Sequence, residues 1–164
     1  MKLFTCLVVV ASTCATALSQ DITAGTYRIL GVQSNKYAYN FPLTIPEPGW
    51  NSITFEADGS HARNNSLWKI RPNPAEDSGW LIQNVVSSYY AYVPPEHYAG
   101  TVVTAYSVEP AAFAIEPAGA GTWVIKAPNE DLLWTVYPVR GNQFMPILED
   151  ASGIDQQKFK LIKA

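Results

Sequence analysis

The side chains that could carry catalysis are few in this chain of 164 residues. Its two histidines, His61 and His97, stand in loops without a recognisable partner. The remaining candidates are three adjacent acidic pairs: Glu76-Asp77, Glu130-Asp131 and Glu149-Asp150. Neighbouring carboxylates on one strand or turn point apart, whereas glycoside hydrolysis needs two acids that face each other across a sugar. We therefore interpret the pairs as turn residues and predict no enzymatic activity.

The sequence also lacks the motifs that bind cofactors or metals. The sequence has no Gly-x-Ser-x-Gly elbow, no His-Glu-x-x-His and no Gly-rich phosphate loop. Two isolated histidines cannot form a closed metal site without several carboxylates. We expect neither a cofactor nor a metal.

The elements that would position any site are strands in a threefold repeat. Each repeat opens on a turn residue, an aromatic, a spacer and an isoleucine: Gly25-Thr26-Tyr27-Arg28-Ile29, Ser78-Gly79-Trp80-Leu81-Ile82 and Gly121-Thr122-Trp123-Val124-Ile125. A second strand follows ten positions after each aromatic, at Tyr37, Tyr90 and Leu133. Self-similarity at a fixed period predicts a repeat architecture.

Two further runs complete each repeat. The third runs are Ile53-Thr54-Phe55, Val102-Val103-Thr104 and Met145 to Leu148, and the fourth are Trp68-Lys69-Ile70, Phe113-Ala114-Ile115 and Phe159-Lys160-Leu161. The 12 prolines and 10 glycines fall largely between apolar runs and leave little room for helix. We predict an all-β fold, a β-trefoil of three four-strand units, with a sandwich or another barrel as the alternative. At alternating positions we expect four core aromatics: Trp68, Trp80, Trp123 and Phe159.

Residues 1–19 have the pattern of a secretory signal peptide, with Lys2 before an apolar run and small residues ahead of a cleavage site after Ser19. A membrane anchor is the alternative, although the run is shorter than the roughly 20 apolar residues that a bilayer needs. Cleavage removes both cysteines, Cys6 and Cys14, and leaves one domain of residues 20–164. We expect a secreted, extracellular protein without disulfides or a membrane anchor.

The charge of the chain bears on its partners. The formal net charge is −3, and the 11 Lys and Arg residues are scattered along the sequence. Nucleic-acid binding needs a clustered basic face that displaces counterions from phosphates. We therefore expect no nucleic-acid partner.

The repeat resembles the ricin-B-like trefoils, a family that includes many secreted fungal lectins. Three stretches carry the resemblance: Gly25-Thr26-Tyr27-Arg28-Ile29, Gly100-Thr101-Val102-Val103 and Gln156-Gln157-Lys158-Phe159. The last resembles the family's Gln-x-Trp signature with Phe for Trp, and Asn65-Ser66-Leu67-Trp68 resembles it with Ser for Gln. The resemblance implies a trefoil lectin that binds glycans or glycoproteins.

The chain departs from the family where its sugar pockets carry an aspartate, because those positions are Tyr39, Tyr92 and Thr135. A sugar can still be held by aromatic stacking and by polar groups that match its hydroxyls. Trp50, in a proline-rich loop, is our candidate for an exposed platform. The other candidates are polar or aromatic residues late in the units: Asn65, Tyr106, Glu109, Asn142, Asp155 and Gln157. The alternative is that each is a solvated loop residue.

A second family with this fold offers another function. Mushroom protease inhibitors of the mycocypin kind also open on a Gly-x-Tyr strand and act through a protruding loop. For a trypsin-like target, Lys36 or Arg140 would enter the protease cleft. A third hypothesis is a trefoil that keeps neither activity. The sequon Asn64-Asn65-Ser66 also permits N-glycosylation at Asn64.

Overall fold

The structure is a computed structural model, and it describes residues 21–42, 49–59, 63–75, 79–108, 110–128, 130–140 and 143–164. The predicted signal peptide and the candidates Glu109 and Asn142 lie outside these residues. Arg140 ends a strand, but its side chain is not among the described ones.

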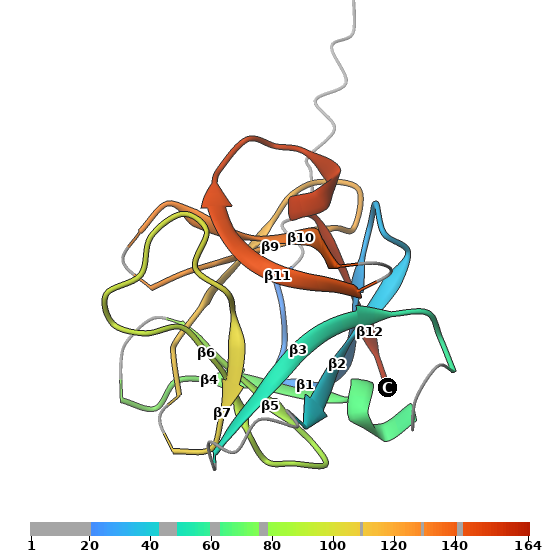
Figure 1. The fold of residues 1–164 in the computed structure, drawn as a ribbon, viewed down its shortest axis with the longest axis vertical. Coiled ribbons are helices and arrows are strands. Elements are labelled where there is room, and N and C mark those ends of the chain that lie inside the picture. Colours follow the sequence, from blue (N-terminus) through green and yellow to red (C-terminus); the bar gives the residue numbers. More distant parts are fainter. Residues whose placement is uncertain are drawn as a thin grey trace, which may run out of the picture.

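The described chain forms three units of four strands, as the repeat predicts (Figure 1). The first unit comprises β1 (Gly25–Gly31), β2 (Lys36–Pro42), β3 (Trp50–Glu56) and β4 (Trp68–Pro72). The second comprises β5 (Trp80–Asn84), β6 (Tyr90–Tyr92), β7 (Thr104–Tyr106) and β8 (Ala114–Pro117). The third comprises β9 (Trp123–Lys126), β10 (Leu132–Arg140), β11 (Gln143–Asp150) and β12 (Phe159–Lys163). Two 3-10 helices, η1 (Arg63–Ser66) and η2 (Asp155–Gln157), precede β4 and β12.

The first and fourth strands of the units close an antiparallel barrel. Its strands pair in the order β1, β4, β5, β8, β9 and β12, with β12 returning to β1 and with β5 joined to β8 by the bridge between Trp80 and Phe113. The second and third strands form three hairpins that pair with one another at Trp50–Tyr106, Phe55–Phe144 and Val102–Ile147. In Figure 1, β3, β7 and β11 surround the centre of the view. This confirms the predicted β-trefoil.

The core follows the repeat position by position. Trp68, Phe113 and Phe159 open or immediately precede the fourth strands and are fully buried, and so are the isoleucines of the first strands. Trp123 is buried as expected, whereas Trp80 is half-buried against the edge of the core. Burying each large apolar side chain contributes roughly 1.5–3 kcal/mol. The alternating pattern of the sequence thus corresponds to one shared core.

One strand differs from its prediction. In the middle unit the third strand begins at Thr104, and Val102 makes only a single bridge to Ile147. The middle hairpin is therefore shorter than its two counterparts, and the chain between β6 and β7 forms a long connection that carries His97.

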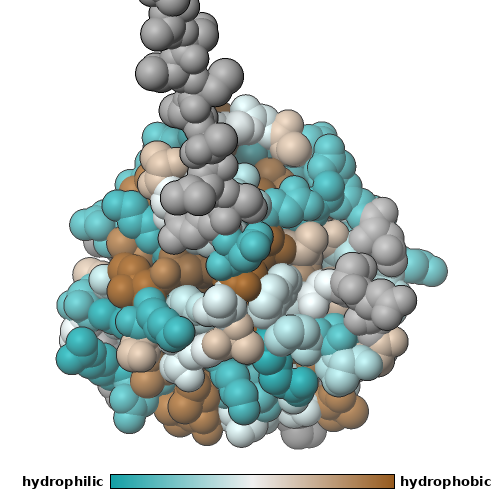
Figure 2. All heavy atoms as spheres, turned by 180° about the vertical axis from the view of Figure 1, so that it is seen from behind, coloured by the Kyte–Doolittle hydropathy of each residue, from teal (hydrophilic) through white to brown (hydrophobic). Residues whose placement is uncertain are grey.

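The surface is mixed in character. On the face turned away from Figure 1, hydrophobic residues lie in small groups between hydrophilic ones (Figure 2). Within the described part of the chain, no helix is long and apolar enough to span a membrane. No group of His, Cys, Asp or Glu side chains there could hold a metal ion.

Candidate functional site

Three pockets share one construction and lie at the three junctions between units. Each is bounded by the hairpin of one unit, the segment before that unit's fourth strand, and the turn after the first strand of the next unit. We name each pocket by two numbers, first the unit that supplies the hairpin and then the unit that supplies the turn. They are the 3–1 pocket, the 1–2 pocket and the 2–3 pocket. The trefoil therefore places three cavities in equivalent positions, and the side chains that differ between the units decide what each can bind.

The 3–1 pocket is the largest of these, with a volume of about 490 Å³. Its walls are Gly31 to Ser34, part of the β10–β11 hairpin with Tyr137 and Phe144, and Asp155 and Gln156 of η2. Tyr137 is 53% exposed, so its ring is open to a ligand. Two aromatic side chains, one carboxylate and several amide or hydroxyl groups thus line a single cavity.

The carboxylate of this pocket is held in place by a lysine. Asp155 Oδ1 accepts a hydrogen bond from Lys158 Nζ at 2.9 Å, and the aspartate side chain is 61% exposed. Phe144 also lines the pocket, and Lys36 Nζ lies 4.0 Å from the centre of its ring. The hydrogen bond between Lys158 and Asp155 thus uses Oδ1 of the carboxylate.

Gln157 fixes the segment that presents Asp155. Its side chain is buried, and its Nε2 donates to the backbone carbonyl of Asp150 at 2.8 Å and to Thr135 Oγ1 at 3.2 Å. Its Oε1 accepts from the backbone N–H of Ser152 at 2.9 Å. Both ends of the amide are therefore engaged within the protein, and Gln157 is not among the residues that line the 3–1 pocket.

The 1–2 pocket is smaller, about 190 Å³, and is lined by four asparagines, Val86 and Ser87. Asn84 is buried and donates to the backbone carbonyls of Asn65 and Leu67. Asn40 donates to Ser87 Oγ, and its buried Oδ1 has no hydrogen-bond partner in the described structure. Neutral amides dominate this cavity, and Asn65 is the predicted site residue among them.

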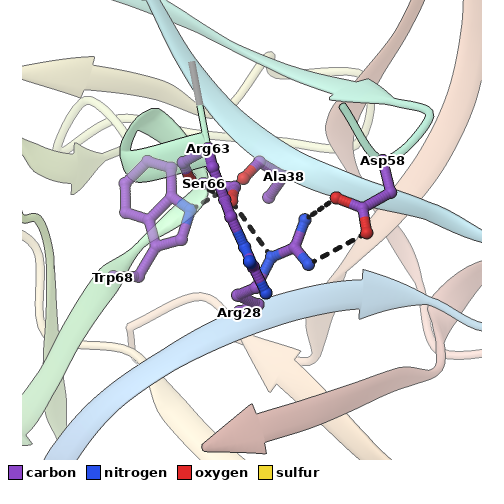
Figure 3. A network of polar contacts seen from close by, with 6 residues as sticks. All are labelled: Arg28, Ala38, Asp58, Arg63, Ser66 and Trp68. Atoms are coloured by element: carbon purple, nitrogen blue, oxygen red, sulfur yellow. Dashed lines mark hydrogen bonds and ion pairs between the residues drawn. The ribbon is translucent and has the colours of Figure 1, made fainter. Parts of the chain in front are cut away.

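A buried arginine holds the helix that carries Asn65 (Figure 3). Arg28 donates from Nε to Ser66 Oγ at 3.1 Å and from its two terminal nitrogens to the carboxylate of Asp58. Its guanidinium also lies 3.5 Å from the centre of the Tyr37 ring. Ser66 in turn donates to the carbonyl of Arg63, which closes η1.

The same pair shifts the titration of both groups. The hydrogen bond from Arg28 is the main cause that lowers the pKa of Asp58 below its ordinary value of 3.8. The hydrogen bond to Asp58 likewise raises the pKa of Arg28. Arg28 and Ser66 together hold η1 in place in the first unit, as Gln157 alone holds η2 in the third.

The two aromatic site candidates, Trp50 and Tyr106, pack against each other. Trp50 begins β3 and is half-buried, and its ring stacks on Tyr106 with centroids 4.2 Å apart, while the edge of Tyr92 approaches at 5.3 Å. Gly49 allows this packing, because its φ is 103° and a Cβ there would lie 2.8 Å from Ser107 Oγ. Trp50 therefore begins a strand and is half-buried, whereas the sequence predicted an exposed loop position.

The other predicted residues have diverse positions. Asp155 lines the 3–1 pocket and Asn65 lines the 1–2 pocket. Lys36 packs on Phe144 at the start of β2, and Asn64 is exposed on η1.

The sequence did not predict several residues that line the pockets. Gln33, Ser34 and Tyr137 line the 3–1 pocket without having been singled out. Tyr137 occupies the same place in the second strand of its unit as Phe41 does in the first unit, and Phe41 is also exposed. Extending the alignment of the repeats by two residues would have identified this exposed aromatic position.

The comparisons with known proteins concern the fold. No family model and no curated protein matches the sequence. Among solved structures, the Rhizoctonia solani agglutinin is similar with a TM-score of 0.73 at 19% identity, over 88% of this chain and 99% of that chain. The Macrolepiota procera ricin B-like lectin, solved in complex with lactose, has a TM-score of 0.67 at 16% identity, over 88% of this chain and 100% of that chain. The designed threefold protein ThreeFoil has a TM-score of 0.69 at 16% identity, over 85% and 99% of the two chains. The chain thus shares the β-trefoil fold of ricin-B-like lectins.

Proposed function

We propose that this protein is a secreted, non-catalytic glycan-binding protein and that its principal site is the 3–1 pocket. The observation that carries the proposal is that the exposed ring of Tyr137 and the carboxylate of Asp155 line the same cavity of about 490 Å³. The shared fold with lectins, one of them solved with lactose, supports a glycan as the class of partner.

The chemistry of the lining matches a sugar. A pyranose offers an apolar C–H face, which packs on an aromatic ring, and a rim of hydroxyls, which need both donors and acceptors. Tyr137 supplies the ring, Asp155 supplies acceptors, and the amides of Gln33 and Gln156 supply both kinds of group. A site of this composition favours binding of a sugar ring.

Catalysis is not part of the proposal. Hydrolysis of a glycosidic bond needs two carboxyl groups on either side of it. Asp155 is the one carboxylate among the residues that line the 3–1 pocket.

The test is glycan-array binding of the purified protein, with affinity then measured by calorimetry for the best sugar. We expect Tyr137→Ala and Asp155→Asn each to weaken binding at least about tenfold, which corresponds to about 1.4 kcal/mol. Lys158→Gln is the matched control for Asp155, because it removes the same ion pair but keeps the carboxylate. Val139→Ala is the control for Tyr137, because Val139 is an exposed residue of the same strand that does not line the pocket. Binding that survives both site substitutions would exclude this pocket.

The protease-inhibitor hypothesis has no described contact in its favour. The ammonium of Lys36 rests on the Phe144 ring, whereas an inhibitory side chain must enter a protease cleft. The hypothesis stays a prediction for Arg140. A trypsin and papain inhibition assay on the same sample tests it, with Arg140→Ala expected to abolish any inhibition.

A further inference from the structure

The 2–3 pocket has a lining unlike the other two. It has a volume of about 340 Å³, and prolines or alanines form most of its wall: Pro94, Pro95, Pro110, Ala111, Ala112 and Pro128. The imidazole of His97 and the carboxylate of Glu130 line the pocket together with this apolar wall. Glu130 occupies the position that a serine holds at the other two junctions, Ser34 and Ser87. A carboxylate at this place is therefore particular to the 2–3 pocket.

His97 has an unused nitrogen in the pocket. Its side chain is only 6% exposed, and its Nδ1 lies 2.9 Å from the backbone carbonyl of Pro94. A carbonyl oxygen only accepts, so Nδ1 carries the hydrogen of this bond. The buried Nε2 has no hydrogen-bond partner among the described residues. Since Nδ1 carries the hydrogen, the neutral ring presents Nε2 as an acceptor.

The second acceptor is the carboxylate of Glu130. Its Oε2 lies 4.0 Å from His97 Nε2, which is too long for a direct hydrogen bond. Glu130 is 45% exposed, and its one described ion-pair contact is this long one, because the nearby Lys126 pairs with Asp131 at 2.8 Å. With His97 in its neutral form, two acceptors thus face each other beside an apolar wall.

A protonated amine satisfies this arrangement. Two acceptors that each lie about 2.8 Å from one ammonium nitrogen, in tetrahedral directions, are about 4.6 Å apart. The observed 4.0 Å is close to that separation, and a small rotation of the exposed Glu130 side chain closes the difference. The carboxylate balances the positive charge, while the proline wall contacts the apolar body of the amine.

We propose that the 2–3 pocket is a second ligand site, specific for a primary ammonium group on a small apolar or ring-shaped body. His97 Nε2 and Glu130 accept its N–H groups, and Pro94, Pro110 and Pro128 enclose its body. The site is independent of glycan binding in the 3–1 pocket, because the two pockets share no lining residue.

Calorimetry with benzylamine tests the proposal, with benzyl alcohol as the uncharged probe of the same shape and phosphate as a buffer without amines. We expect benzylamine to bind and benzyl alcohol to bind at least about tenfold more weakly. Glucosamine against N-acetylglucosamine, and lysine against its Nζ-acetyl form, then distinguish an amino sugar from an amino-acid source. The free amine is expected to bind better in the pair that represents the source.

Glu130→Gln is the decisive variant, because it removes the charge from an exposed, nearly isosteric side chain. We expect it to weaken benzylamine binding at least about tenfold. Glu96→Gln is the matched control, since Glu96 is an exposed carboxylate next to His97 that does not line the pocket. A ¹⁵N shift of His97 Nε2 on adding benzylamine reports the contact directly. Equal binding of the two benzyl probes, no binding of either, or equal effects of the two Glu→Gln variants would overturn the proposal.

Discussion

The buried amide of Gln157 donates to the backbone carbonyl of Asp150 at 2.8 Å. This bond connects the end of β11 with η2, which carries Asp155 into the 3–1 pocket. The amide also accepts from Ser152, so one side chain ties both ends of the connecting loop. In the first unit, Ser66 takes the place of Gln157 and its side chain is shorter. The Arg28 guanidinium makes the corresponding connection there, because it donates both to Ser66 and to Asp58, which lies beyond the end of β3.

Gln157→Ala should therefore affect both stability and binding. It leaves the carbonyl of Asp150 and the N–H of Ser152 without their partner, and unfolding free energy should fall by about 2–3 kcal/mol. Sugar affinity should fall with it, because η2 loses its anchor. Chemical denaturation and calorimetry measure the two effects.

Gln156→Ala is the matched control, since the neighbouring residue lines the pocket and is not buried. It should weaken sugar binding and leave the unfolding free energy almost unchanged. If both variants changed stability equally, Gln157 would not be the anchor of this loop.

Trp50→Ala should destabilise the protein without changing glycan affinity. The substitution removes the stack on Tyr106 and the edge contact with Tyr92, and we expect a loss of about 2 kcal/mol for this half-buried ring. Trp50→Phe keeps an aromatic ring and should recover much of the stability. A loss of sugar affinity in Trp50→Ala at temperatures where it is fully folded would restore Trp50 as a binding residue.

The strands and the core could be predicted because their signals are local. The position of Ile29 in β1 follows from alternation, and its counterparts follow from the repeat. The pockets could not be predicted in the same way, because each combines side chains from two units. Tyr137 and Gln33, for example, meet only when the hairpin of the third unit packs beside the first. The Trp50–Tyr106 stack is likewise a contact between units, so the proline-rich surroundings of Trp50 suggested exposure instead.

Asn64 should carry an N-linked glycan when the protein passes through a eukaryotic secretory pathway. The residue is exposed on η1 and begins the sequon Asn64-Asn65-Ser66. Mass spectrometry should find the modification, and Asn64→Gln should remove it. Asn65→Gln is the control, because it keeps the sequon while altering the lining of the 1–2 pocket. An unmodified protein from such a host would contradict the prediction.

The ion pair between Arg28 and Asp58 should make stability fall on the acid side. Because the pKa of Asp58 in the folded protein lies below its ordinary value of 3.8, the pair contributes its full stabilisation above that value. The contribution is lost as the pH falls through the lower, folded pKa, where the carboxylate takes up its proton. The melting temperature of Asp58→Asn should therefore lie below that of the wild type near about pH 6, and the gap should close towards about pH 2.

A double-mutant cycle isolates this effect from the loss of the aspartate itself. In an Arg28→Met background the guanidinium is absent, so Asp58→Asn should no longer change the melting temperature in a pH-dependent way. Arg63→Gln is the matched cation control, because Arg63 lowers the pKa of Asp58 less than Arg28 does. It should leave most of the gap in place. A gap that stayed constant from neutral to acid pH would mean that Asp58 acts through packing and not through its charge.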